Sequence, residues 1–185
     1  MSSLKEIKGE HVHTRSIHIN TFAAGEDCVL VEGVLEDTRH TLMHSISGQL
    51  RQPSQVHGMV ARFLVGELPA KILDAEAEMP NVPLDGCDEA GDSIKKLIGM
   101  PIVSGFSKAV KGQLGGTQGC NHLTSLALTM GAAAVQSMAA HRGQKPIPPQ
   151  ARAMMLQYVK NSCRVWDENG EVFRNATEKI KKELE

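Results

Sequence analysis

The sequence predicts an α+β fold: an N-terminal antiparallel sheet of about four strands, about four helices packed on one face of it, and a small C-terminal hairpin. The first half of the chain alternates apolar and polar residues, which is the period of a strand with one buried face. The second half carries apolar residues at the period of an amphipathic helix. Because the strands come first and the helices follow, the order favours helices packed on a sheet over repeated βαβ units.

The strands are predicted from alternation, β-branched residues and turn signals. In SIHINTF, Ile17 and Ile19 share one face, and CVLVEGVLED is rich in β-branched side chains. Acidic residues alternate with apolar ones in KILDAEAEM, which indicates a sheet with one solvated face. The segment between the second and third strands is predicted as a loop with room for one short strand. The four strands are expected over residues 16–22, 28–37, 56–65 and 71–79.

The helices are predicted from apolar spacing and from residues that start or stop a helix. The clearest helix contains Leu123, Leu126 and Met130 at helical spacing, and a glycine and a proline follow its end. Ser104 is the expected N-cap of an earlier helix, which Gly115 ends. The helices are expected over residues 89–98, 104–114, about 123–138 and 149–163.

A turn signal and a charged segment define the C-terminal part. Asn169-Gly170, within VWDENGEVF, is typical of a two-residue hairpin turn and predicts a small hairpin there. The last residues, ATEKIKKELE, are predicted to be a solvated helix or disordered. We therefore expect residues 1–173 to form a single α+β domain, followed by a charged C-terminal tail over residues 174–185.

Composition limits the partners and the location of the protein. The chain of 185 residues has a net charge of −1 and only 3% aromatic residues, which argues against binding to nucleic acid. No stretch reaches the roughly 18 apolar residues of a membrane span, and the N-terminus lacks the apolar segment of a signal peptide. We expect a cytoplasmic protein without membrane or nucleic-acid partners, which leaves a small-molecule ligand and a homo-oligomer open.

The stretch LGGTQGCNHLTSLAL places Cys120 and His122 at the start of the clearest helix. The unpaired N–H groups and the positive dipole end of a helix stabilise a thiolate there, and a nearby imidazole can share the thiol proton. Gly116 and Gly119 allow the backbone to approach a bound group closely. These residues predict a catalytic Cys120 and His122 with Gly116 and Gly119 as binding residues, although a cysteine here can also simply pack.

The same residues also fit a metal site. Cys87 and Cys163 could join Cys120 and His122 as a zinc or iron ligand set, although the spacing lacks the local pairs of a zinc knuckle. His13 belongs to an H-x-H pair, whose two side chains share one face of a strand. The predicted metal ligands are therefore Cys120, His122, Cys163, Cys87 and His13.

Other polar residues in the first half show no decisive partner in the sequence. Nothing spaces Asp37 and Asp74 as a catalytic carboxylate pair, and no neighbour suggests a role for His57. The phosphate-binding loop, the dinucleotide fingerprint, the serine-hydrolase elbow and the HExxH zinc motif are all absent from the sequence. Their absence argues against nucleotide hydrolysis, hydride transfer and serine or zincin hydrolysis.

Five segments follow one another along the chain: HVHTRSI, VEGVLEDT, the strand pair over 56–79, LGGTQGCNHLTSLAL and KNSCRVWDENG. Their order resembles a bacterial family catalogued as a domain of unknown function, number 2889. The likeness covers about Val12 to Gly170, and its most specific part is the GGxxGCxHL block, in which Asn121 replaces the family's usual threonine. The resemblance implies importance for Cys120, His122, Cys163 and His13 but brings no established activity.

A fainter likeness in shape concerns iron–sulfur scaffold and sulfur-acceptor proteins, in which Cys87 and Cys120 would be the matching positions. Three classes of function therefore remain open. The first is a thiol or metal site, either in an enzyme acting on a small acyl or aromatic molecule or in a sulfur or cluster carrier. The second is a non-catalytic module that binds a small ligand or partner through its Met- and Ala-rich helices. The third is a structural homo-oligomer.

Overall fold

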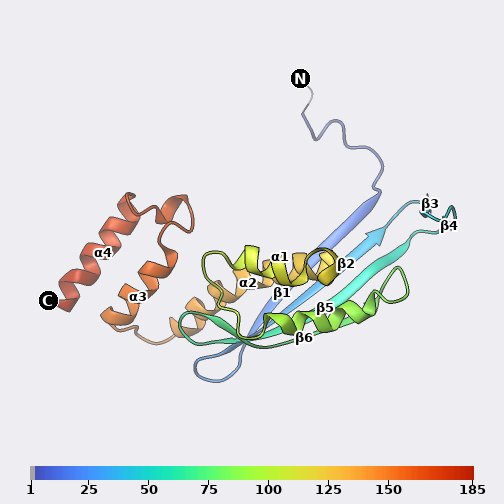
Figure 1. The fold of residues 1–185 in the computed structure, drawn as a ribbon. Helices are drawn as coiled ribbons and strands as arrows, with labels where there is room; N and C mark the ends of the chain where they lie inside the picture. Colours follow the sequence, from blue (N-terminus) through green and yellow to red (C-terminus); the bar gives the residue numbers. More distant parts are fainter. Residues whose placement is uncertain (1–2) are drawn as a thin grey trace.

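A four-stranded antiparallel sheet with the order β1-β2-β5-β6 forms the base of the fold (Figure 1). The protein was analysed as a computed structural model, which describes residues 3–185. The strands are β1 (His13–Ala23), β2 (Val29–Arg39), β5 (Ser54–Gly66) and β6 (Lys71–Asn81), and they confirm the four predicted strands. Between β2 and β5, the short strands β3 (Met43–His44) and β4 (Leu50–Arg51) form a second sheet that projects beyond the end of the first.

The helical half begins with a 3-10 helix and contains one long helix that contributes a stripe of buried apolar residues to the core. The bounds are η1 (Asp88–Leu97), α1 (Phe106–Leu114), η2 (Gly116–Gln118), α2 (Asn121–Arg142), α3 (Pro149–Val159), η3 (Arg164–Trp166) and α4 (Glu171–Leu184). The elements η1, α1 and α2 cover one face of the sheet, whereas α3 and α4 pair with each other beyond its end (Figure 1). The α+β fold class is therefore confirmed.

Helix α2 is the core helix of the domain. Its length and apolar composition would suffice to cross a membrane. Its face of Leu123, Leu126 and Met130, however, is fully buried among the core residues of the sheet, which include Val31 and Phe63. Burial of one stripe against a sheet accounts for the apolar character of this helix.

Two glycines allow α2 to approach its neighbours closely. A Cβ atom added at Gly33, in the middle of β2, would lie 2.8 Å from Met130 Sδ. A Cβ atom added at Gly131 would lie 2.3 Å from Cε1 of Phe106, the first residue of α1. These contacts set the distance of α2 from the sheet and from α1, and so they also set where the N-terminus of α2 lies.

The predicted C-terminal hairpin is wrong. Asn169-Gly170 does form a turn, in which the Asn169 N–H donates to the Asp167 side chain at 2.8 Å, but the turn leads into helix α4. Beyond it, Val172 and Ile180 stand at helical spacing, and Ile180 is buried where α4 packs on α3. The predicted tail is thus most of α4, and the predicted domain boundary at residue 173 falls inside that helix.

Two smaller expectations about the helices are also corrected, one on the type of the first helix and one on the N-cap of α1. The first helix is a 3-10 helix, and the N-cap of α1 is Gly105 with φ of +90°, not Ser104. A left-handed residue directly before a helix suits glycine, which pays no Cβ penalty there.

The contact between α1 and α2 can be tested with two glycine-to-alanine variants. Gly131→Ala should lower the free energy of unfolding by about 1–2 kcal/mol, because the Phe106 ring must move to make room. In Gly112→Ala, in α1, the added Cβ atom has no neighbouring atom within 4 Å. This variant should raise the free energy of unfolding by about 0.5–1 kcal/mol through helix propensity alone. Urea unfolding measures both values, and an equal stabilisation by the two variants would contradict this packing.

Candidate functional site

The register of the sheet brings three polar side chains together at one end of its helix-covered face. Arg15 of β1 stands directly opposite Asp37 of β2, and Asp37 stands directly opposite His57 of β5. Along β2, Asp37 continues the buried alternation of Val31 and Leu35, and only 1% of its surface is exposed. A carboxylate is therefore held on the apolar side of the sheet, next to an irregularity in the β2–β5 register between Asp37 and Thr38.

Arg15 compensates the buried carboxylate. The Nε atom of Arg15 donates to Oδ1 of Asp37 and its Nη2 atom donates to Oδ2, each at 2.7 Å. The two residues form a bidentate ion pair. This interaction holds the pKa of Asp37 below its ordinary value and outweighs the opposing effect of burial. Asp37 is therefore an anion at neutral pH, and its orientation is fixed by the planar guanidinium group.

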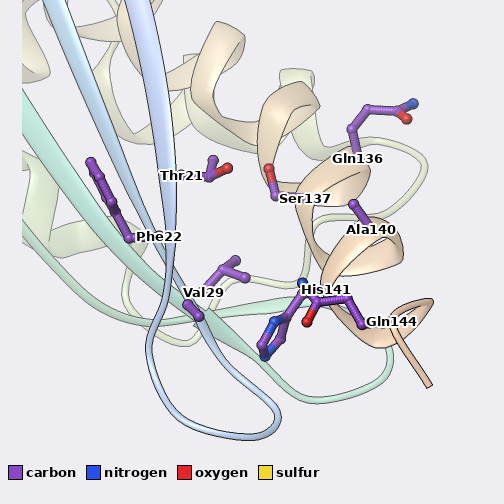
Figure 2. A pocket seen from close by; sticks show the side chains of 9 residues that line it. Thr21, Phe22, Val29, Gln136, Ser137, Ala140, His141 and Gln144 are labelled. Atoms are coloured by element: carbon purple, nitrogen blue, oxygen red, sulfur yellow. The ribbon is translucent and has the colours of Figure 1, made fainter.

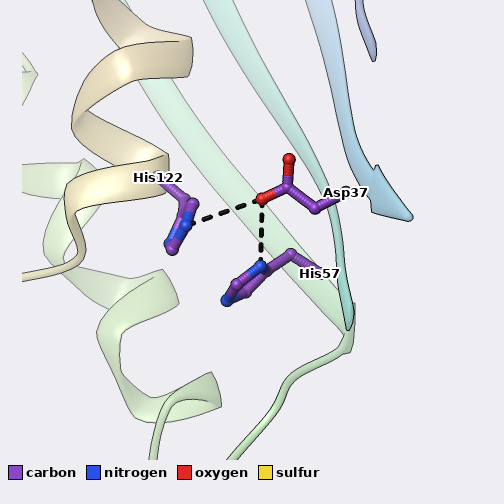
Figure 3. Close-up of side chains that lie close together, drawn as sticks. All are labelled: Asp37, His57 and His122. Atoms are coloured by element: carbon purple, nitrogen blue, oxygen red, sulfur yellow. Dashed lines mark hydrogen bonds and ion pairs between the residues drawn. The ribbon is translucent and has the colours of Figure 1, made fainter. Parts of the chain in front are cut away.

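Three histidines surround the remaining lone pairs of Asp37. The Nδ1 atom of His57 lies 3.0 Å from Oδ2, and Nε2 of His122 lies 3.6 Å from the same oxygen (Figure 3). The Nε2 atom of His13 lies 3.5 Å from Oδ1. His122 comes from the first turn of α2, so the sheet and the core helix meet at this carboxylate.

The environment of His122 favours its neutral form. Burial lowers its pKa below the ordinary value; His57 and Arg15 lower the pKa further, and Asp37 acts in the opposite direction. The rings of His57 and His122 lie against each other with their centroids 3.8 Å apart and their planes inclined by 31°. A neutral imidazole has one ring nitrogen free to accept a proton, as a general base requires.

Cys120 lies on the other side of His122. Its Sγ atom is 3.7 Å from Nδ1 of His122. Cys120 directly precedes the first residue of α2 and takes the N-cap position, although its side chain makes no capping hydrogen bond. The side chain is a free thiol of intermediate burial. Thr124 fixes the backbone here, because its buried hydroxyl donates to the carbonyl oxygens of both Leu114 and Cys120.

The two glycines predicted to bind a ligand shape the loop that leads to Cys120. Gly116 has a positive φ of +59°, and a Cβ atom at Gly119 would lie 2.8 Å from Ser93 Oγ of η1. Gly119 also borders a cavity of about 450 Å³ whose charged lining residues include Glu89 and Lys96. Close packing explains Gly119 by itself, and its role in ligand binding stays a prediction.

The predicted metal ligands divide into two sets. The structure places His13 and His122 beside Asp37 and places Cys120 beside His122, but it does not bring Cys87 and Cys163 into this group. Cys87 precedes η1, and Cys163 is exposed between α3 and η3. Within residues 3–185, one group of three His, Cys, Asp or Glu side chains has ligand atoms within 4.8 Å of one another, and it consists of Asp37, His57 and His122.

Sequence reasoning missed Arg15, Asp37 and His57. A signal was present, because each of them occupies a core-facing position at the end of an otherwise apolar alternation. Asp37 follows Val31 and Leu35, and His57 precedes Met59 and other buried residues of β5. Polar and charged residues at core-facing positions near the ends of three neighbouring strands indicate a site, but only the strand register shows that they meet.

A second hollow lies at the opposite end of β1 and α2 (Figure 2). It measures about 330 Å³, and Thr21 and Ser137 line it from the strand and the helix. His141 also lines it, with Nε2 lying 3.0 Å from the backbone oxygen of Gly25. None of the residues that the sequence predicts as functional lines this hollow.

The fold and the site define an α+β protein in which a carboxylate at the end of the sheet lies next to an imidazole, and this imidazole lies next to the thiol of the residue that precedes helix α2. Residues 13–136 match the family described as "Protein of unknown function (DUF2889)", and the chain belongs to this family. The matched segment contains Arg15, Asp37, His57, Cys120 and His122 and ends before α3. The comparison found no match among the curated proteins or among the solved structures.

The ion pair predicts a large difference between two carboxylate-to-amide variants. Asp37→Asn should lower the free energy of unfolding by about 2–3 kcal/mol, because it breaks a pair whose carboxylate is buried while Arg15 stays partly exposed. Glu78→Gln removes an exposed partner of Arg62 and should cost less than about 1 kcal/mol. Denaturant unfolding of the three proteins provides the comparison, and similar losses for both variants would argue against a structural role of Asp37.

Proposed function

We propose that the protein is a cytoplasmic thiol-dependent enzyme that transfers the acyl group of a small acyl or aromatic ester or thioester. Cys120 is the nucleophile, His122 is the general base and acid, and Asp37 orients His122. The observation that carries this proposal is the position of His122, with Nδ1 3.7 Å from the Cys120 sulfur and Nε2 3.6 Å from the Asp37 carboxylate. A nucleophile, a base and an orienting group in this order form a catalytic triad.

The tautomer of His122 follows from the charge of Asp37. An anionic carboxylate accepts hydrogen bonds, so it favours the proton of a neutral His122 on Nε2. The Nδ1 atom is then the free acceptor, and this is the atom that faces the thiol. Distances slightly beyond hydrogen-bond length are expected before a substrate closes the site.

The proposed reaction begins when the Cys120 thiol gives its proton to Nδ1 of His122 and its sulfur attacks the carbonyl carbon. The bond to the leaving group breaks, and His122 returns the proton to the departing alcohol or thiol. Water then attacks the resulting thioester and gives a proton to His122. The C–S bond breaks, the acid is released, and His122 returns the proton to the Cys120 sulfur. The first N–H groups of α2 have no intrahelical acceptor and can stabilise negative charge on sulfur and on the carbonyl oxygen.

Acylation by p-nitrophenyl acetate tests this proposal. We expect nitrophenol release together with an acetyl group on Cys120, located by peptide mass spectrometry. Cys120→Ser should abolish this labelling, and His122→Gln should slow it by about 100- to 10,000-fold because the general base is lost.

Cys163 is the internal control, because it is exposed and lies outside the Asp37 group. Its labelling rate should be the same in wild type and in His122→Gln. Equal reactivity of Cys120 and Cys163 in the wild-type protein would refute a catalytic Cys120. Circular dichroism and urea unfolding of each variant separate a lost base from a lost fold.

A further inference from the structure

We infer that Asp37, His57 and His122 form a binding site for a divalent transition-metal ion, with Zn²⁺ as its first candidate and Fe²⁺ as its second, and that a bound ion switches off Cys120. The metal site stands on its own geometry, and only the switch rests on the proposed thiol function. This ligand set shares only His122 with the predicted one, and Asp37 and His57 of the sheet stand in place of the three cysteines and His13.

The distances between the three ligand atoms suit one ion. A metal bound tetrahedrally at about 2.1 Å holds its ligand atoms roughly 3.4 Å apart. Oδ2 of Asp37 lies 3.0 Å from Nδ1 of His57 and 3.6 Å from Nε2 of His122 (Figure 3). Each of the three residues offers one ligand atom that lies within 4.8 Å of the ligand atoms of the other two, a spacing close to that of a bound ion.

The chemistry of the donors supports the same class of ion. Two imidazole nitrogens and one carboxylate oxygen are the ligands of many catalytic zinc sites and of non-haem iron(II) sites. Arg15 is an outer partner of the ligand Asp37. Its guanidinium group holds the carboxylate so that Oδ2 faces both histidines. The positive charge of Arg15 also opposes a cation, which favours a reversible site over a permanent one.

Metal binding and base catalysis compete for the same imidazole. A metal on Nε2 of His122 displaces the proton from that nitrogen and leaves it on Nδ1. A protonated Nδ1 cannot accept the thiol proton of Cys120, which lies 3.7 Å away. The ion also withdraws Asp37 from orienting His122. A bound metal therefore blocks the step that activates the thiol.

Zinc binding to the tag-free protein tests the site, with competition by a chromophoric zinc indicator as the readout. We expect one Zn²⁺ per wild-type chain. His57→Gln and His122→Gln should each weaken binding by more than the roughly 10–100-fold that loss of an outer partner of a ligand costs. His18→Gln, which alters an exposed histidine of β1, is the matched control and should bind as wild type does. Each variant is compared with wild type by urea unfolding, which separates a lost ligand from a lost fold.

Cys120→Ser separates this ligand set from the one that the sequence predicts. It should retain zinc binding, whereas a site built on Cys120, Cys87 and Cys163 would lose it. Loss of binding in Cys120→Ser with full binding in His57→Gln would overturn the inference. Absence of stoichiometric binding to wild type, with Zn²⁺ and with Fe²⁺ under anaerobic conditions, would also overturn it.

The acetylation rate of Cys120, measured with and without one equivalent of Zn²⁺, tests the switch. We expect at least a tenfold fall on zinc addition in wild type and no change in His57→Gln. Zinc that binds without slowing Cys120 would refute the switch and leave the metal site supported. A Cys120 that is inert even without metal refutes the proposed enzyme instead, so the two failures can be told apart.

Discussion

The ion pair between Arg15 and Asp37 is the interaction on which the rest of the site depends. A carboxylate on the apolar face of a sheet is expensive unless it is paired and hydrogen-bonded. Arg15 reaches it from the neighbouring strand with two hydrogen bonds and leaves room on the carboxylate for the histidines. The anion then lies within 3.6 Å of ring nitrogens of His13, His57 and His122, and in the proposed mechanism it favours the proton of His122 on Nε2.

Helix α2 provides the second half of the arrangement. The apolar stripe of α2 packs across the sheet. Gly33 and Gly131 permit the close approach that sets the distance of α2 from the sheet and from α1. The first turn of α2 therefore lies at the end of the sheet that holds Asp37. The same residues that build the core thus place His122 and Cys120, so stability and site geometry share one set of contacts.

The fold could be predicted from the sequence because it follows from local patterns. Alternation of apolar and polar residues predicted all four long strands. Helical spacing predicted α2 and thereby placed Cys120 at its N-terminus. The hairpin predicted at Asn169-Gly170 is wrong because the same turn signal can precede a helix as well as join two strands. Burial of Ile180, in the helix that packs on α3, favours the helix. Asp37 and His57 could not be assigned because their partnership depends on register between strands, which no short stretch of sequence contains.

The site residues come from distant parts of the chain: Arg15, Asp37, His57 and His122 lie on three strands and one helix. Contacts of such high sequence separation form late, after the loops between them have closed. Before then, Cys120 is an ordinary cysteine without an imidazole–carboxylate pair beside it. Under the proposed mechanism, the sulfur of Cys120 is therefore activated only in a molecule that has completed its folding.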